Sequence, residues 1–167
     1  LAVMPYFGGI QTTVDLHTIP LFHANGWGAP QACTLMGATH VMVRRFDPAL
    51  VCELIQTHRA NHMSLVPTMA NALLNFLDLA NYDLSSLRFV MIGGAAASPE
   101  LIARLEKTLR CSCVAAGYGL SETSPVLTVA TDRPGLTFSS DDDRRRHRAM
   151  AGWPVPNVEL RVVDLHL

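Results

Sequence analysis

The chain has 167 residues, 49% of them hydrophobic and 16% charged, a composition that suits one globular domain with a substantial core and excludes a disordered chain. A formal net charge of -1 leaves no broad basic surface for a nucleic acid, and no apolar run approaches the roughly 20 residues of a membrane span. The first segment, 1–10, lacks the features of a signal peptide, so we expect a cytoplasmic protein, and the absence of an initiating Met suits a chain cut from a longer one.

Predicted strands and helices alternate along most of the chain. Strands are expected over 16–21, 40–43, 63–66, 87–92 and 113–116. Helices are expected over 28–36 and after Asp47-Pro48, Thr68 and Ser98-Pro99, where Asp47, Thr68 and Ser98 can cap the helix start. Repeated strand–helix units with short loops predict an α/β fold with a parallel sheet flanked by helices.

Apolar side chains at helical spacing predict which faces of the last three helices are buried. The expected inner faces are Leu50, Val51, Leu54 and Ile55; Met69, Leu73, Phe76 and Leu77; and Leu101, Ile102, Leu105 and Leu109.

The pattern changes after residue 130. Residues 131–150 are polar, and their nearly balanced charges predict a solvated loop or a frayed helix rather than a binding patch. A rigid turn at 152–156 and alternation over 158–163 then predict the first strand of a separate β subdomain. The expected division is a central α/β portion at 1–130, a polar loop at 131–150 and the beginning of a β subdomain at 151–167.

Four cysteines and a pair of histidines raise the question of metal binding. We expect reduced, mostly buried thiols rather than zinc ligands or disulfides at Cys33, Cys52, Cys111 and Cys113. His58 and His62 have a spacing that can bind a metal on a helix, but with no third ligand nearby we interpret them as surface histidines.

Three residue clusters follow predicted strands, at 20–27, 93–99 and 117–125, and ligands of parallel sheets bind at the carboxyl ends of strands. Each has a simpler interpretation: Gly-rich segments often only turn the chain, Tyr118 and His23 can be satisfied core side chains, and Glu122 can be a surface charge. The 117–125 cluster has the most specific chemistry. Its glycines permit close approach of a flat ligand, Tyr118 can stack on a nucleobase, Ser121 can bind a phosphate oxygen and Glu122 can hold Mg²⁺.

These clusters carry a resemblance to the adenylate-forming (AMP-binding) superfamily. GYGLSETSP, PLFHANGW, GGAAASPEL and GWPVPNVELRVVD resemble four of its motifs, in the family's order and with family-like spacing from about Leu16 to Asp164. Within the superfamily the chain is most similar to bacterial fatty-acyl-CoA synthetases, on the HANGW string and residues 45–48. Ser121 replaces the family's usual Thr, and either Ala96 or Ala97 fills its alanine position.

The resemblance implies a two-step reaction of a fatty acid or other carboxylic acid with ATP, Mg²⁺ and coenzyme A. The carboxylate attacks the α-phosphate of ATP to give an acyl-adenylate, and coenzyme A then displaces AMP. It implies nucleotide contacts from Gly94, Ala95, Ala96, Gly117, Tyr118, Gly119 and Ser121. Glu122 is the implied metal ligand, and the implied catalytic residues are His23, Ser121 and Glu122.

The implied acyl pocket comprises His23, Trp27, Gly93 and Gly94, and Trp27 has an equal alternative as a packed core indole. The family's phosphate loop, ribose-binding aspartate, hinge and C-terminal lysine have no counterpart in these residues, so we expect the isolated chain to be inactive. An aryl-CoA ligase, a luciferase-like enzyme, a peptide-synthetase adenylation domain and a non-catalytic nucleotide-binding module remain alternatives. The full-length protein can also be a homodimer.

Overall fold

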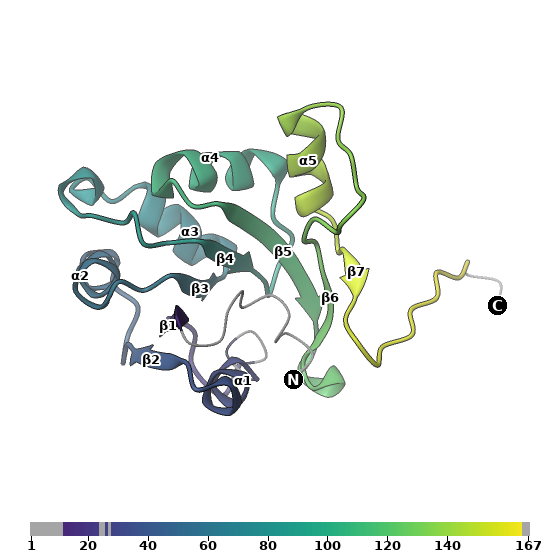
Figure 1. Cartoon of the computed structure of the whole chain (residues 1–167), viewed down its shortest axis with the longest axis horizontal. Helices are drawn as coiled ribbons and strands as arrows, with labels where there is room; N and C mark the ends of the chain where they lie inside the picture. The colour runs from purple at the N-terminus through teal and green to yellow at the C-terminus, as the bar shows by residue number, and fades with distance from the viewer. Residues whose placement is uncertain (1–11, 24–25, 27, 165–167) are drawn as a thin grey trace.

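The computed structural model describes residues 12–23, 26 and 28–164, which form a sheet with helices packed against it (Figure 1). Its strands lie in the order β2-β1-β3-β4-β5-β6-β7. They are β1 (Val14–His17), β2 (Thr39–Met42), β3 (His62–Leu65), β4 (Phe89–Ile92), β5 (Cys113–Gly119), β6 (Val126–Val129) and β7 (Trp153–Pro154). The helices are α1 (Ala29–Met36), α2 (Pro48–His58), α3 (Pro67–Leu74), α4 (Pro99–Leu109) and α5 (Asp141–Arg148), with short 3₁₀ turns η3 (Leu79–Asn81) and η4 (Ser121–Thr123).

The sheet is parallel from β2 to β5, as predicted, and antiparallel at β6 and β7. β5 takes part in both patterns: residues 113–116 pair with β4, and residues 117–119 pair with β6. The prediction that this strand ends at Ala116 is therefore wrong, because β6 returns alongside Gly117–Gly119 and extends it.

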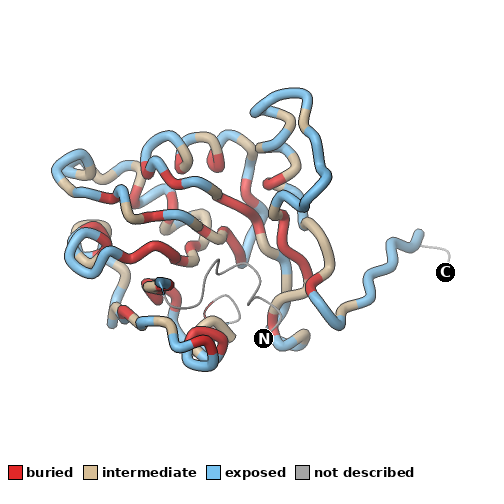
Figure 2. Tube along the Cα trace, in the orientation of Figure 1, coloured by how far each residue is buried: buried red, intermediate tan, exposed pale blue. Residues whose placement is uncertain are grey.

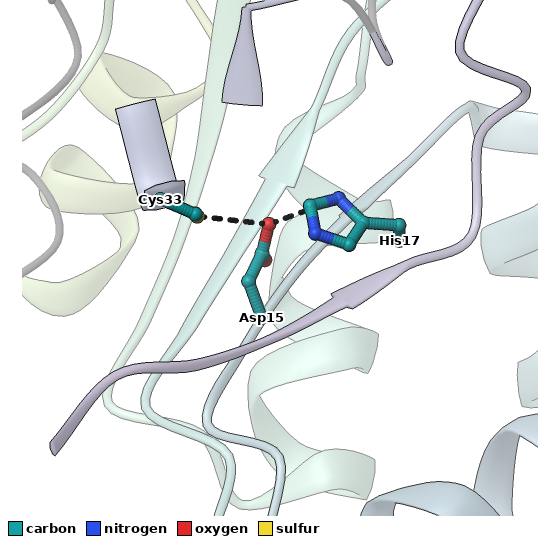
Figure 3. Close-up of side chains that lie close together, drawn as sticks. All are labelled: Asp15, His17 and Cys33. Atoms are coloured by element: carbon teal, nitrogen blue, oxygen red, sulfur yellow. Dashed lines mark hydrogen bonds and ion pairs between the residues drawn. The ribbon is translucent and has the colours of Figure 1, made fainter. Parts of the chain in front are cut away.

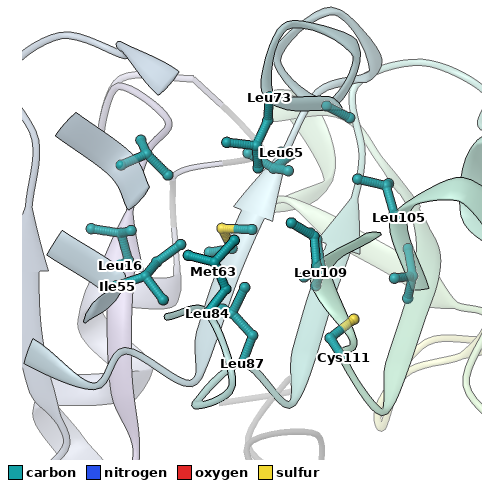
Figure 4. Packing of buried hydrophobic residues seen from close by; sticks show 14 of the residues in the cluster. Leu16, Ile55, Met63, Leu65, Leu73, Leu84, Leu87, Leu105, Leu109 and Cys111 are labelled. Atoms are coloured by element: carbon teal, nitrogen blue, oxygen red, sulfur yellow. The ribbon is translucent and has the colours of Figure 1, made fainter. Parts of the chain in front are cut away.

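One face of the sheet packs against α2, α3 and α4 in a continuous hydrophobic core (Figure 4). Alternate strand residues such as Met63 and Leu65 point into it, and the red segments of Figure 2 follow the central strands. On α4 the predicted inner face, Leu101, Ile102, Leu105 and Leu109, is buried throughout. On α2 the buried stripe is Val51, Cys52 and Ile55, so Leu54 is only half-buried and the prediction of a buried Leu50 is wrong.

Helix starts follow the predicted caps in two cases. Asp47 Oδ1 accepts the amide of Leu50 at 3.0 Å, and Ser98 Oγ accepts the amide of Leu101 at 3.2 Å. Thr68 is not a cap, because α3 already begins at Pro67, whose fixed φ and missing N–H suit the first helical position. Because α3 ends at Leu74, Leu77 lies beyond it and is 96% exposed, contrary to its predicted place on the inner face.

The polar segment contains an ordered helix rather than a loop. Ser140 caps α5 through the amide of Asp143, and Arg148 anchors the other end. The Arg148 guanidinium donates to Asp132 Oδ1 and Oδ2 at 3.1 and 2.7 Å, and to Glu106 Oε1 of α4 at 2.6 Å. Of the two predicted alternatives, the structure has the helix, and the partly buried ion pairs of Arg148 hold it in place rather than leaving it frayed.

Two further expectations differ from the structure. Residues 158–163 form no strand, and the strand that pairs with β6 is the short β7 instead. His62 is buried on β3 with its Nδ1 2.6 Å from Asn61 Oδ1, so it is not a surface histidine, whereas His58 is exposed as expected. Among the described residues, no helix combines the length and apolarity that crossing a membrane requires.

Candidate functional site

The carboxyl ends of β4 and β5 border a surface groove of about 340 Å³. Its walls come from the segment after β4, from the end of β5 and from the segment after α5. They are formed by Gly94, Ala95, Ala96, Ala97, Ala116, Gly117, Tyr118, Gly119, Leu120, Ala149, Met150 and Ala151. The structure therefore brings together six of the seven residues that the resemblance implies for nucleotide contacts.

Tyr118 is the aromatic side chain of this groove. The residue is 46% exposed, and it also lines a smaller hollow of about 40 Å³ with Met91, Gly93 and Pro125. A half-exposed ring beside two open spaces can offer a face to a flat ligand, which a fully packed core tyrosine cannot.

Glycines occupy three positions of the groove where a side chain would be crowded or strained. A Cβ at Gly119 would lie 1.8 Å from the carbonyl oxygen of Pro125, and a Cβ at Gly117 would lie 3.1 Å from Met91 Sδ. Gly94 has a φ of +81°, a conformation that glycine adopts without strain. These three glycines therefore shape the groove as well as leaving it open.

Ser121 and Glu122 lie on η4, next to the groove, but they are not among its lining residues. The turn that carries them is fixed by Thr123, whose hydroxyl oxygen accepts the Leu120 amide at 3.0 Å and lies 2.8 Å from the Pro125 carbonyl oxygen. Both Ser121 and Glu122 are exposed, and none of the ion pairs found among the described residues involves Glu122. An exposed, uncommitted carboxylate has the oxygen donors that Mg²⁺ prefers.

His23 lies in the turn after β1 and does not line the groove. Its amide donates to the Pro20 carbonyl at 3.0 Å, and its own carbonyl accepts the Gly26 amide at 2.9 Å. The side chain is exposed, and its ring centroid lies 4.6 Å from that of Phe22. Trp27 lies outside the described residues.

Sequence reasoning missed the third wall of the groove, which comprises Ala149, Met150 and Ala151. Met150 is 60% exposed there. No periodicity marks these residues, because the wall depends on the long-range ion pairs of Arg148 that position α5.

A second group of polar side chains was also not predicted from the sequence. Asp15 and His17 of β1 lie beside Cys33 of α1 (Figure 3). Burial raises the pKa of Asp15 to about 7 and that of the Cys33 thiol to about 12. Burial, with a smaller contribution from His40, lowers the pKa of His17 to about 4. The available signal was the alternation of β1, which places Asp15 and His17 on the face opposite Leu16.

Comparisons with known proteins agree with the fold and with the family resemblance. The chain is 39% identical over 152 residues to a long-chain-fatty-acid–CoA ligase of Thermus thermophilus. This alignment covers 90% of this chain and 28% of that protein. It is 34% identical over 153 residues to 4-coumarate–CoA ligase 3 of Arabidopsis thaliana, covering 91% of this chain and 26% of that protein. The chain thus spans between a quarter and a third of the length of these relatives.

Solved structures of the same kind superpose on nearly the whole chain. A putative long-chain-fatty-acid CoA ligase from Rhodopseudomonas palustris matches with a TM-score of 0.74 at 29% identity, covering 98% of this chain and 37% of that one. An amide bond synthetase from Marinactinospora thermotolerans matches with a TM-score of 0.77 at 29% identity, covering 98% and 31%. Residues 2–167 match the AMP-binding enzyme family, and the chain belongs to that family.

Proposed function

We propose that the protein is an ATP-dependent acid–thiol ligase that joins a fatty acid to coenzyme A. The carboxylate attacks the α-phosphorus of ATP, which forms the acyl-adenylate and releases pyrophosphate. The coenzyme A thiol then attacks the acyl carbon, which forms the thioester and releases AMP. The family match and the 39% identity to a long-chain-fatty-acid–CoA ligase support this proposal.

The observation that carries the proposal is the groove at the carboxyl ends of β4 and β5. Its volume of about 340 Å³ lies within the range of about 300–1,000 Å³ of small-molecule sites. In the proposed complex the adenine ring stacks on Tyr118, while backbone groups of Gly94, Ala95 and Ala96 lie along its edge. Gly117 and Gly119 carry no side chain that would block this approach.

The reacting end of the nucleotide is assigned to the turn that follows. Ser121 donates its hydroxyl to a phosphate oxygen, and Glu122 would hold Mg²⁺, which supplies positive charge against the charge on the phosphates. His23 is assigned to the substrate carboxylate, and Trp27 to the entrance of the acyl pocket. Exposure of Ser121 and Glu122 beside the groove supports the first two assignments.

Two other functions remain candidates. An aromatic acid is the alternative to a fatty acid, supported by the 34% identity to a 4-coumarate–CoA ligase. An amine is the alternative to coenzyme A as acyl acceptor, supported by the likeness to an amide bond synthetase. A non-catalytic nucleotide-binding module is the second alternative, because a groove of this kind accounts for nucleotide binding without any catalytic step.

The test is ATP–pyrophosphate exchange by the full-length protein with fatty acids of increasing length and with 4-coumarate. We expect exchange with a fatty acid and coenzyme A-dependent release of AMP. Tyr118→Ala should raise the KM for ATP about 10-fold or more, because base–aromatic stacking contributes about 1–3 kcal/mol. Tyr118→Phe, which keeps the aromatic ring, should have a KM close to that of the wild type.

Glu122→Gln should lower the rate and raise the Mg²⁺ concentration that gives half of the maximal rate. Glu53→Gln is the matched control, since Glu53 is exposed on α2 and lines no groove wall. Exchange with 4-coumarate alone would replace the fatty acid by an aryl substrate. Nucleotide binding without exchange on any acid would favour the non-catalytic module.

A further inference from the structure

Three potential metal-ligand side chains converge between β1 and α1 (Figure 3), and none of them lines the groove. Asp15 and His17 project from β1 toward α1, which carries Cys33. His17 Nδ1 lies 3.3 Å from Asp15 Oδ2, and Cys33 Sγ lies 3.5 Å from the same oxygen. All three residues are buried, at 5%, 8% and 0% exposure.

These separations suit a tetrahedral ion. With zinc–nitrogen bonds of about 2.0 Å and zinc–sulfur bonds of about 2.3 Å, neighbouring ligand atoms lie roughly 3.3–3.6 Å apart. The His17–Asp15 and Cys33–Asp15 distances fall in this range, and all three ligand atoms lie within 4.8 Å of one another. Thiolate, imidazole and carboxylate together are the donor set of Zn²⁺, whereas Mg²⁺ and Ca²⁺ take oxygen ligands.

A chain of hydrogen bonds orients the histidine. His17 Nε2 lies 2.9 Å from His40 Nδ1, and His40 Nε2 lies 3.2 Å from Thr34 Oγ1. If His17 Nε2 donates to His40, then His40 donates to Thr34, and His17 Nδ1 is left with a lone pair facing Asp15 and Cys33. Zinc-bound histidines commonly have such a partner on the second ring nitrogen.

Room for a fourth ligand lies next to two of the three groups. A hollow of about 10 Å³ is lined by Asp15, His17, Gly26 and Ala29, among others. About 10–15 Å³ is the space that one water molecule needs. A water in this hollow completes a four-coordinate site.

We propose that Asp15, His17 and Cys33 form a Zn²⁺ site that ties β1 to α1. The site is structural: it joins the two elements that flank the turn carrying His23, and so fixes both ends of that turn. This inference is independent of the proposed ligase activity, since it concerns residues outside the groove.

The experiment titrates the metal-free, nucleotide-free full-length protein with Co²⁺, which replaces Zn²⁺ and reports its ligands by absorption. We expect one equivalent to give the visible bands of tetrahedral Co²⁺ and a thiolate-to-cobalt charge-transfer band, both removed by Zn²⁺. X-ray absorption of the zinc-loaded protein should show one sulfur ligand, a measurement that needs no variant.

Cys33→Ser should abolish the charge-transfer band, whereas Cys52→Ser should keep it; both cysteines have 0% exposure, which makes them a matched pair. His40→Gln should weaken Co²⁺ binding about 10–100-fold, as expected for loss of the partner of a ligand. Absence of stoichiometric binding, a zinc site without sulfur, or a charge-transfer band that survives Cys33→Ser in a folded variant would each overturn the proposal.

Discussion

At the residue scale, Gly119 is the position of β5 that is least able to accept a side chain. The backbone crosses Pro125 so closely that a Cβ would lie 1.8 Å from its carbonyl oxygen and 2.8 Å from its carbonyl carbon. Both neighbours are main-chain atoms, so a rotamer change cannot relieve the overlap. The glycine therefore allows β5 to lie directly against Pro125, between Tyr118 and the Ser121–Glu122 turn.

Gly119→Ala should lower the free energy of unfolding by about 1–3 kcal/mol, the usual effect of forced overpacking. Because the overlap displaces Tyr118 and the adjoining turn, ATP–pyrophosphate exchange by the full-length protein should fall about a hundredfold. Gly135→Ala is the control, since Gly135 has a φ of +89° but no atom within 4 Å of its Cβ position. It should cost about 1–2 kcal/mol with unchanged exchange. Equal exchange in the two variants would contradict this role of Gly119.

Single residues were predictable where they belong to a short sequence motif. The resemblance to the adenylate-forming superfamily named six of the residues that line the groove, whereas the residues taken alone pointed to the cluster at 117–125. His62 was misassigned because its burial depends on the pairing of β3 with its neighbours, which the spacing of histidines does not contain. Met150 had no local signal at all.

At the element scale, α5 shows how a polar segment becomes part of a packed structure. Its sequence has no apolar face, and its attachment depends on Arg148, whose side chain is 9% exposed and contacts Glu106 and Asp132. The caps of α2 and α4 were predictable because each involves residues three apart. The anchoring of α5 was not, because its partners lie 16 and 42 residues away in sequence.

Arg148→Met should lower the free energy of unfolding by about 2–4 kcal/mol, since it leaves two carboxylates without their main partner, one of them partly solvated. Arg144→Met is the matched control: Arg144 is 45% exposed and its closest carboxylate is 3.4 Å away, so the cost should be below about 1 kcal/mol. Urea unfolding measures both. Similar losses in the two variants would contradict the anchoring role.

The ion pair between Arg148 and Asp132 should make the stability of the fold depend on pH. Hydrogen bonding to Arg148 is the main cause that lowers the pKa of Asp132 below its usual value. The charged carboxylate therefore stabilises the fold above the ordinary aspartate pKa of about 4, and this contribution is lost as the pH falls through the lowered value. The stability difference between the wild type and Asp132→Asn should accordingly be full at neutral pH and shrink in acid.

At the scale of the whole molecule, the fold class was predictable because the alternation of apolar strands and capped helices repeats along the chain. The antiparallel strands β6 and β7 were not predicted, because the residues after 150 were expected to begin a separate β subdomain. Residues 158–163 alternate like a strand, but a strand needs a partner, and within the described residues β6 pairs with β7 instead. The groove unites segments near residues 95, 118 and 150, and only tertiary packing brings them together.

A polypeptide of these 167 residues alone should bind an acyl-adenylate analogue weakly and form no acyl-CoA. In the proposed complex the groove supplies contacts for a base, whereas phosphate chemistry also needs oriented amides and cations for the developing charge, and the resemblance implies that these come from other segments. Calorimetry with the analogue and a thioester assay measure the two properties, with Tyr118→Ala as the variant that should lose binding. Rapid ATP-dependent acyl-CoA formation by this polypeptide would contradict the expectation.

The change of pairing along β5 has a thermodynamic consequence. Tyr118 belongs to the portion that pairs with β6, whereas Ala95 and Ala96 follow β4, on the parallel side. In the proposed complex a purine between them bridges two parts of the sheet that differ in strand direction, so its affinity should include the free energy of keeping those parts in one relative orientation. This coupling is reciprocal. A change that stabilises the paired strands β6 and β7 should increase the affinity for the nucleotide, and nucleotide binding should stabilise these strands by the same free energy.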